Sequence, residues 1–493
     1  MSPLPHVIYN QDCTDLFVHV KEPLEPRHVD RMVDEAATGG ADLFLVNPNA
    51  QRVNYPSSVW QTFWDGYAPG RREFFGPIPD DQLAQRERWV GQMQRLAEQC
   101  CDYVERALAR CRHCGIMAGI SVRMNDMHDV PWPGSHLFSS FYMGHPELRL
   151  DNPPVCGWSA KGLNYEHQAV RDHYLVLIRE LAANYDFDAL ELDFLRFHCY
   201  FPRREFGAHA AIMTEFVREV RRILDGTGRD ALLTARIPAT PASAFELGLD
   251  LEAWAEESLV QAIAPAAFLN TAWDMSVHEF RRVTKGRIAV YPCADASACR
   301  PDSLPSRSLP TDPELLRGFA AGYLGAGADG VEFFNFFCPR EEVTPAEPRF
   351  DVLRELRDLG SLRGRPKAYT LTSGWAIAEA DGPFQVPALL PPSHPRPFTF
   401  LLAAEPPGCN VVVDVTFEGA APAADRLWLH VNHLTAGSAQ TVTSSTFGEK
   451  TFHTARFAVP VAALRDGEST LTLRNESNCA LTVHLIDVRV GQG

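Results

Sequence analysis

Eight short, continuous apolar runs, separated by segments of helical period, constrain the fold of this chain most strongly. Runs without polar alternation are typical of strands that are covered on both faces, as in a parallel sheet. Eight such strands close a TIM-type (β/α)8 barrel, which we expect between about Val7 and Phe337. An open doubly wound sheet is the alternative, but no Gly-rich phosphate loop follows the first strand. The predicted strands are His6–Asn10, Asp42–Val46, Gly115–Val122, Phe187–Phe194, Ala231–Ile237, Leu259–Ala264, Arg287–Tyr291 and Asp329–Asn335.

Apolar residues at helical spacing predict helices between these runs. The predicted helices are Asp81–Cys111, Glu166–Tyr185, Glu205–Leu224 and Asp312–Leu324. The aromatic-rich stretch Ala50–Asp80 has no period, so we expect a long loop over the barrel mouth after the second strand.

The pattern changes after about Gly364, where helical periods end and alternating strands begin. Alternation of apolar and polar residues is typical of half-buried antiparallel strands. We therefore expect two domains, a catalytic barrel over residues 1–364 and a β-sandwich over residues 365–493. Strands are predicted at Asn410–Phe417, Arg426–Leu434, Phe452–Val459, Thr470–Arg474 and Leu481–Val490, with the Pro-rich stretch Pro387–Pro397 as a link.

The 493 residues carry a formal net charge of −16, spread along the chain. This balance argues against a nucleic-acid partner, which calls for a basic face. Neither a signal peptide nor an apolar run long enough to span a membrane is visible, so we expect a cytoplasmic protein without a membrane partner. In that compartment we expect the 12 cysteines to be reduced thiols. Whether the chain is a monomer or a homodimer is open.

Polar residues follow most of the predicted strands, where the active sites of TIM barrels lie. They are expected to converge on one face of the barrel and to bind substrate. The residues are Asn10, Asp12, Asn47, Asn49, Arg123, Asn125, Asp126, Arg196, His198, Arg236, Tyr291 and Asn335.

Glu191 and Asp193 on the fourth strand are the strongest candidates for catalytic residues. Side chains two residues apart on a strand share a face, so both carboxylates can enter the barrel mouth. Two nearby carboxylates supply an acid and a base at neutral pH, as glycoside hydrolysis requires. Arg196 is expected to hold Asp193 ionised. The alternative is that Glu191 is buried in an ion pair with Arg236 or Arg123.

A further catalytic carboxylate is predicted at Glu332 on the last strand, facing Asp193 across the mouth, and Asp126 is another candidate. Strand parity separates Glu332 from Asn335, because only one of the two can point inward. Asn335 is favoured as the ligand contact.

Aromatic residues in the second and third loops favour a sugar ligand, since flat apolar faces stack on pyranose rings. Tyr55 and Trp64 are expected to contact the sugar, in a set that also holds Trp60, Phe63, Tyr67, Trp132, Phe138, Phe141, Tyr142 and Trp158.

Two segments raise the question of a metal. Cys111-Arg-His-Cys114 lacks a second CxxC, and ligands as close in sequence as those of Arg123-Met-Asn-Asp-Met-His-Asp129 rarely converge on one ion. We therefore predict neither a metal nor another cofactor, and we expect the second segment to form hydrogen bonds with sugar hydroxyls.

Three motifs resemble those of uncharacterised bacterial TIM-barrel proteins described as family 10-like or glycosyl-hydrolase-like. They are Tyr185-Asp-Phe-Asp-Ala-Leu-Glu-Leu-Asp-Phe-Leu-Arg196, Gly162-Leu-Asn-Tyr-Glu-His167 with Val170-Arg171, and Gly330-Val-Glu-Phe-Phe-Asn335. In such proteins the fourth strand reads Asp-Gly-apolar-x-apolar-Asp, and its last Asp is the presumed catalytic group. The resemblance places that role on Asp193, with Ala189 where Gly is usual. It covers the barrel, and the C-terminal sandwich is similar to those that accompany glycosidase barrels.

The sequence therefore predicts a glycoside hydrolase with a carbohydrate substrate, in which Asp193 is nucleophile or base. One alternative is a carbohydrate lyase or isomerase, in which a carboxylate or His198 abstracts a proton. Another is a carbohydrate-binding protein without catalysis.

Overall fold

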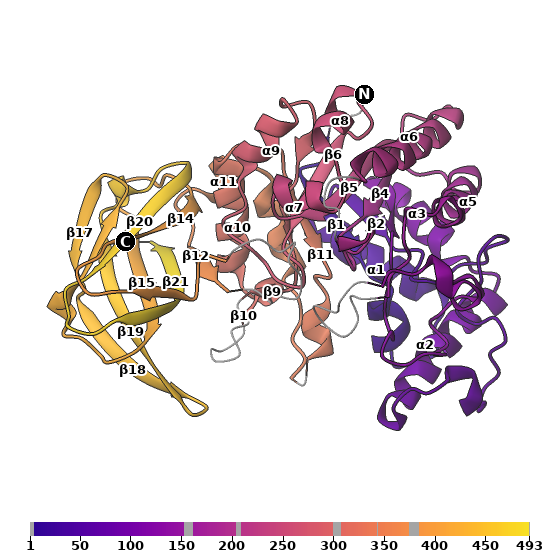
Figure 1. The fold of residues 1–493 in the computed structure, drawn as a ribbon, viewed down its shortest axis with the longest axis horizontal. Coiled ribbons are helices and arrows are strands. Elements are labelled where there is room, and N and C mark those ends of the chain that lie inside the picture. Colours follow the sequence, from indigo (N-terminus) through magenta and orange to yellow (C-terminus); the bar gives the residue numbers. More distant parts are fainter. Residues whose placement is uncertain are drawn as a thin grey trace.

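A parallel sheet that closes on itself forms the first part of the chain (Figure 1). The structure is a computed structural model that describes residues 4–151, 161–203, 209–298, 307–342, 344–373 and 384–492. The strands of this sheet are β1 (Val7–Gln11), β2 (Leu43–Val46), β3 (Met117–Arg123), β4 (Ala189–Asp193), β5 (Leu232–Pro238), β6 (Ala262–Ala266), β7 (Ala289–Val290), β8 (Cys293–Ala294) and β11 (Val331–Phe334).

The two edges of the sheet, β7 and β8, belong to one stretch of chain that is interrupted only at Tyr291 and Pro292. β7 pairs with β6, while β8 pairs with β11, which in turn pairs with β1. Pro292 has no N–H to donate to a neighbouring strand. The interruption therefore divides one strand in two without opening the barrel, and all eight predicted barrel strands are confirmed.

Helices follow most of the strands and cover the outside of the barrel (Figure 1). They are α1 (Pro26–Gly39), α2 (Asp80–Glu98), α3 (Tyr103–Cys114), α4 (Ser140–Gly144), α5 (Gln168–Asn184), α6 (Ala210–Gly226), α7 (Pro241–Glu246), α8 (Leu251–Glu256), α9 (Val277–Val283), α10 (Pro313–Gly325) and α11 (Leu359–Leu362). α5, α6 and α10 match predicted helices, although residues 205–208 of the predicted third helix lie outside the described ranges.

The prediction of one helix over Asp81–Cys111 is wrong, because the chain breaks between α2 and α3. Cys100 adopts a left-handed conformation with a φ of 55°, which ends the first helix. The Asp102 side chain then accepts hydrogen bonds from the backbone N–H groups of Val104 and Glu105, as an N-cap does. Apolar spacing continues through the break, so periodicity alone does not reveal it.

The C-terminal part consists of two antiparallel sheets, as predicted. One contains β12 (Lys367–Thr372), β13 (Ala388–Leu390), β15 (Asn410–Glu418), β18 (Thr441–Phe447), β19 (Lys450–Val459) and β21 (Leu481–Gly491). The other contains β14 (Arg396–Leu402), β16 (Leu427–Val431), β17 (Leu434–Ser438) and β20 (Gly467–Asn475). Part of the Pro-rich stretch predicted as a link is thus strand, in β13 and the start of β14.

α10 lies between the barrel and these antiparallel sheets (Figure 1). A Cβ at Gly318 would lie 1.9 Å from the carbonyl oxygen of Ala368 in β12, and one at Gly322 would lie 2.5 Å from that of Leu401 in β14. Glycine one turn apart on a helix allows close backbone approach. Gly318 and Gly322, here called the glycine seam, therefore allow α10 to pack closely against β12 and β14.

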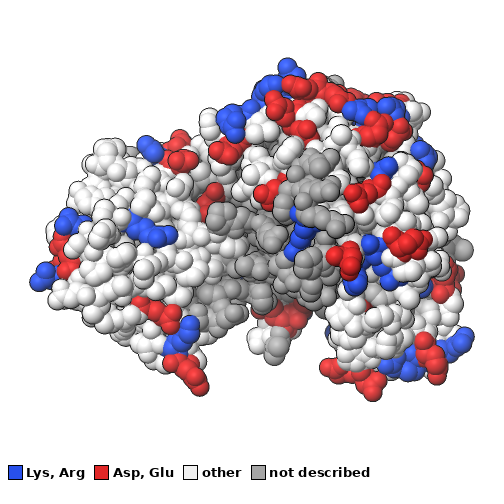
Figure 2. Space-filling view, in the orientation of Figure 1, with Lys and Arg blue, Asp and Glu red and all other residues white. Residues whose placement is uncertain are grey.

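Acidic and basic side chains are interspersed on the face shown in Figure 2. Arg218 of α6, for example, pairs with Glu215 on the same helix and with Glu257 after α8. Within the described ranges, no helix combines the length and apolar character needed to cross a bilayer.

Candidate active site

β4 places two carboxylates inside the barrel, Glu191 and Asp193, while Leu190 and Leu192 join the surrounding core. Asp193 binds the guanidinium of Arg236 on β5, with Nε–Oδ1 and Nη2–Oδ2 distances of 3.0 Å each. Oδ1 also accepts hydrogen bonds from the backbone N–H groups of Leu195 and Arg196, at 3.1 and 3.0 Å. Both oxygens therefore act only as acceptors, as expected of an ionised carboxylate.

The Arg236 guanidinium lies over the Phe334 ring, with its Cζ 3.8 Å from the ring centroid. This places the guanidinium where it can compensate the Asp193 charge. The expectation that Arg196 does so is wrong: its backbone contacts Asp193, but its guanidinium points to His128.

Glu191 lies deeper, in contact with β1 and β3. Its Oε1 accepts a hydrogen bond from Asn10 Nδ2 at 2.6 Å and one from Ser121 Oγ at 2.7 Å. Asn10 Nδ2 also lies 3.4 Å from Glu332 Oε1, so the amide bridges two carboxyl groups. The alternative of an ion pair between Glu191 and Arg236 or Arg123 is wrong, because these arginines bind aspartates instead.

The pKa of Glu191 is raised well above the usual glutamate range, first by burial and then by the nearby Glu332 and Asp193. Burial also raises the pKa of Glu332, although Arg236 and Asn10 oppose the shift. Two carboxyl groups close together cannot easily both ionise. The pair therefore holds a proton at pH values where an exposed glutamate has lost it.

On β11 the side chains of Glu332 and Phe334 face the interior of the barrel, while Phe333 packs outward against Phe319 of α10. The expectation that Asn335, and not Glu332, points inward is therefore wrong. Asn335 follows the strand in a left-handed conformation with a φ of 53°, and its backbone N–H donates to the Asn10 carbonyl at 3.2 Å. Asn335 thus turns the chain at the strand end.

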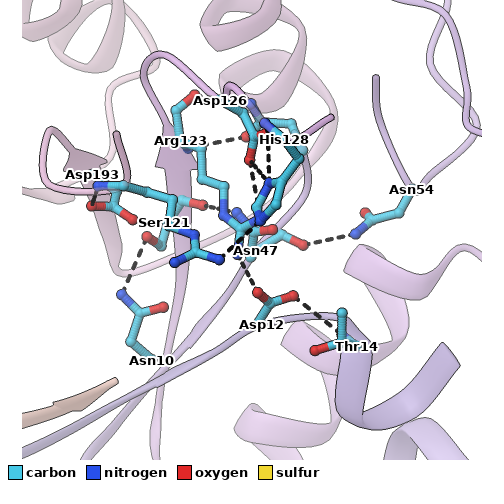
Figure 3. Close-up of polar contacts among 12 residues, drawn as sticks. Asn10, Asp12, Thr14, Asn47, Asn54, Ser121, Arg123, Asp126, His128 and Asp193 are labelled. Atoms are coloured by element: carbon cyan, nitrogen blue, oxygen red, sulfur yellow. Dashed lines mark hydrogen bonds and ion pairs between the residues drawn. The ribbon is translucent and has the colours of Figure 1, made fainter. Parts of the chain in front are cut away.

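A charged cluster surrounds the ends of β1, β3 and β4 (Figure 3). The Arg123 guanidinium binds Asp12 through Nη2 and Asp126 through Nη1, the latter at 3.2 Å. Asp126 in turn accepts from His128 Nδ1 at 2.8 Å, and His128 Nε2 lies 3.0 Å from Arg196 Nη2. Burial opposes ionisation of Asp126, but His128 and Arg123 together hold its pKa well below its usual range.

Three predicted amides bind backbone groups and so position the loops. Asn47 Nδ2 donates to the Ser121 carbonyl, and Asn49 exchanges hydrogen bonds with the backbone of Arg123. Asn125 does the same with the backbone of Leu163. These contacts hold the second and third loops against β3.

His198 is also buried near the mouth, and its ring lies edge-on to Phe268. Burial lowers the pKa of His198 to about 4, so the ring is neutral at physiological pH.

Tyr55 and Trp64 are not brought to the mouth. The Tyr55 hydroxyl donates to Glu180 on α5 at 2.7 Å, outside the barrel. Trp64 packs beside a small apolar cluster that includes Phe75 and Val90. The second loop therefore buries aromatics against helices, and Trp158, from the same predicted set, lies outside the described residues.

Tyr291 is turned to the opposite end of the barrel. Its ring packs with Ile8 and Ala189, and it lies next to Gly330, where an added Cβ would come within 2.7 Å of the ring. Burial raises the pKa of the Tyr291 phenol, as do Asp42 and Asp329, which precede their strands. Pairing continues past Tyr291 to β8, so Tyr291 lies before the carboxyl end of this strand, whereas it was predicted at that end.

Three residues at the site were not predicted there: Ser121, Cys293 and Asp295. His128 belongs to the segment that was expected to bind sugar hydroxyls, but it was not singled out. Ser121 was recoverable from parity, because it stands two residues before Arg123. Asp295 follows the seventh strand, whose interruption hides that end in the sequence. Among the described residues, no group of three or more His, Cys, Asp or Glu side chains could hold a metal ion.

No family model and no curated protein sequence matches the chain. Solved structures with similar folds include the glycoside hydrolase domain of PgaB (BpsB) from Bordetella bronchiseptica, at 13% identity and a TM-score of 0.44, covering 72% of this chain and 99% of that one. Another is α-L-fucosidase isoenzyme 2 from Paenibacillus thiaminolyticus, at 8% identity and a TM-score of 0.42, with 71% of this chain covered and 48% of the fucosidase. A third is the α-galactosidase TtGalA from Thermus thermophilus, at 15% identity and a TM-score of 0.38, with coverages of 76% and 64%. The chain thus spans about half the length of the fucosidase.

Proposed function

We propose that this chain is a glycoside hydrolase whose reaction takes place at the carboxyl ends of the barrel strands. The observation that carries the proposal is the contrast between two neighbouring carboxyl groups on β4. Asp193 is bound by Arg236 and two backbone N–H groups, whereas Glu191 shares a buried pair with Glu332 that retains a proton. Carboxyl groups held in opposite protonation states are the requirement for acid–base cleavage of a glycosidic bond.

In this proposal Asp193 supplies the negative charge that the anomeric carbon needs as the bond breaks. The proton for the leaving oxygen comes from the Glu191–Glu332 pair. Arg236 orients Asp193 through both of its oxygens, while Asn10 and Ser121 hold Glu191 in place through its Oε1 atom.

The test is turnover of a broad panel of aryl glycosides and oligosaccharides by the full chain and by Asp193→Asn. Asn has the shape of Asp but cannot carry its charge, so we expect kcat to fall by a factor of about 10²–10⁴. Asp414→Asn is the matched control, because Asp414 is a buried aspartate that also binds an arginine, Arg456, through both oxygens, at 2.7 and 2.8 Å. It lies in β15 of the C-terminal sheets and should leave kcat unchanged.

Full turnover by Asp193→Asn would contradict the proposed role of Asp193. Products with a new carbon–carbon double bond, detected by ultraviolet absorption, would instead indicate a lyase. Calorimetric binding of a sugar without any product would indicate a carbohydrate-binding protein.

A further inference from the structure

His128 is an accessible member of the charged cluster at the barrel mouth. Its side chain is 35% exposed, compared with 2% for Asp126 and 5% for Arg123. Asp12, at the end of β1, is similarly enclosed. Water can therefore reach the His128 ring, whereas the aspartates of this cluster are enclosed.

The contacts of His128 define which ring nitrogen carries the proton. Nδ1 lies 2.8 and 3.0 Å from the two carboxylate oxygens of Asp126, which can only accept. Nε2 lies 3.0 Å from Arg196 Nη2, which can only donate. Nδ1 therefore carries the hydrogen, and Nε2 presents a lone pair.

Neighbouring groups hold the ring in this orientation. The Asp126 carboxylate is itself anchored by Arg123 and by the backbone N–H of His128, at 3.2 and 3.0 Å. The ring of Phe197 stands edge-on to the imidazole, with centroids 4.7 Å apart and an interplanar angle of 87°. Figure 3 shows Asp126 and His128 beside Arg123, whose charge also interacts with that of Asp193. The arrangement is a carboxylate–imidazole dyad, built from one loop and oriented from two sides.

We propose that His128 is a further catalytic residue, the base that takes a proton from the attacking water, and that Asp126 is its positioning residue. This inference rests on the proposed function, since it assigns a role within glycoside hydrolysis. A water molecule that takes the place of Arg196 Nη2 at Nε2 would be held by the lone pair.

The proton balance of the step is simple. As the water oxygen forms its bond to the anomeric carbon, its O–H bond breaks and the proton passes to Nε2. The imidazolium that results is stabilised by the Asp126 carboxylate and later loses this proton to solvent through its exposed side. The bond to the leaving oxygen breaks in the same displacement, and that oxygen receives its proton from the Glu191–Glu332 pair.

The test compares His128→Ala and His128→Gln with the wild-type chain on a glycoside that the wild type cleaves. A lost general base lowers kcat by a factor of about 10²–10⁴, with little change in KM. Because the side chain is partly exposed, added imidazole can reach the space left in His128→Ala, and we expect it to restore part of kcat in a saturable way. A residue that only supports the fold would not respond to imidazole.

His145→Ala is the matched control. His145 also binds a carboxylate two residues away, with Nδ1 2.9 Å from Glu147 Oε1, and is 49% exposed, but it lies after α4. It should keep wild-type kcat and show no response to imidazole.

Retention of wild-type kcat by both His128 variants, beside an inactive Asp193→Asn, would overturn the role of His128 and leave the proposed function standing. Folded but inactive His128→Ala without rescue would also overturn it. An absence of any glycoside turnover by the wild type would overturn both proposals.

Discussion

Arg236 binds both carboxylate oxygens of Asp193 from the neighbouring strand, and the two side chains are only 3% and 1% exposed. An ion pair so enclosed is held together by mutual neutralisation, since neither charge has water to solvate it. The geometry of Asp193 in the proposed reaction therefore depends on Arg236, and so does the stability of the barrel.

We expect Arg236→Met to lower the free energy of unfolding by about 3–5 kcal/mol, because it leaves the Asp193 charge buried and unpaired. The double variant Asp193→Asn/Arg236→Met should lower the free energy of unfolding by less than Arg236→Met alone, because it removes both charges. Urea unfolding of the three proteins measures this. Arg456→Met is the control: Arg456 is 50% exposed and Arg489 still lies 3.4 Å from Asp414, so the loss should be about 1 kcal/mol or less.

The stability of the protein should also depend on pH through the Glu191–Glu332 pair. Burial and the neighbouring carboxylates raise the pKa of Glu191 in the folded state, so the folded chain keeps a proton that the unfolded chain loses. This contribution to stability is fully present below the usual glutamate pKa of about 4.3 and declines, by about 1.4 kcal/mol per pH unit and proton, as the pH rises through the folded pKa. Glu191→Gln cannot ionise and should flatten that decline in urea unfolding between pH 4.5 and 8. An equal decline in both proteins would contradict the prediction.

The sequence was a good guide to the barrel because its strands are continuous apolar runs and each is only a few residues long. The alternation of side chains along a strand also predicted correctly that Glu191 and Asp193 share a face, because both lie within one uninterrupted strand. Strand ends were harder to predict. Pairing continues past Tyr291 to β8, so Tyr291 lies toward the opposite end of the barrel from the site, and Asn335 turns the chain after β11.

Pairing between strands was harder to predict than the strands themselves. Arg196 was expected to pair with Asp193, and Arg236 was considered only as a partner of Glu191, but cross-strand register places Arg236 of β5 directly opposite Asp193. Tyr55 was assigned to a sugar because loop aromatics often stack on ligands, yet a carboxylate on α5, Glu180, offered its hydroxyl a buried partner. Such choices depend on three-dimensional neighbours that a single sequence does not contain.

The proposed acid should give the reaction a basic limb in its pH profile. The Glu191–Glu332 pair can protonate the leaving oxygen only while it holds a proton, so kcat should fall as the pH rises through the raised pKa of the pair. Glu191→Gln keeps the shape of the side chain and should lose most of kcat. Glu180→Gln is a matched control, because Glu180 is a buried glutamate with four hydrogen bonds on α5. A Glu191→Gln enzyme with the wild-type kcat and basic limb would place the acid elsewhere.

The glycine seam of α10 makes a prediction that does not depend on function. In Gly318→Ala the new Cβ would meet the backbone oxygen of Ala368 at 1.9 Å, and backbone cannot move aside as a flexible side chain can. α10 or β12 must shift, and overpacking of this kind costs about 1–3 kcal/mol. Gly226→Ala, at the end of α6, has no atom within 4 Å of its new Cβ and should be neutral or stabilise by up to about 1 kcal/mol. Thermal unfolding of the two variants beside the wild type checks the contrast, and equal melting temperatures would show that α10 is not tightly packed against the antiparallel sheets.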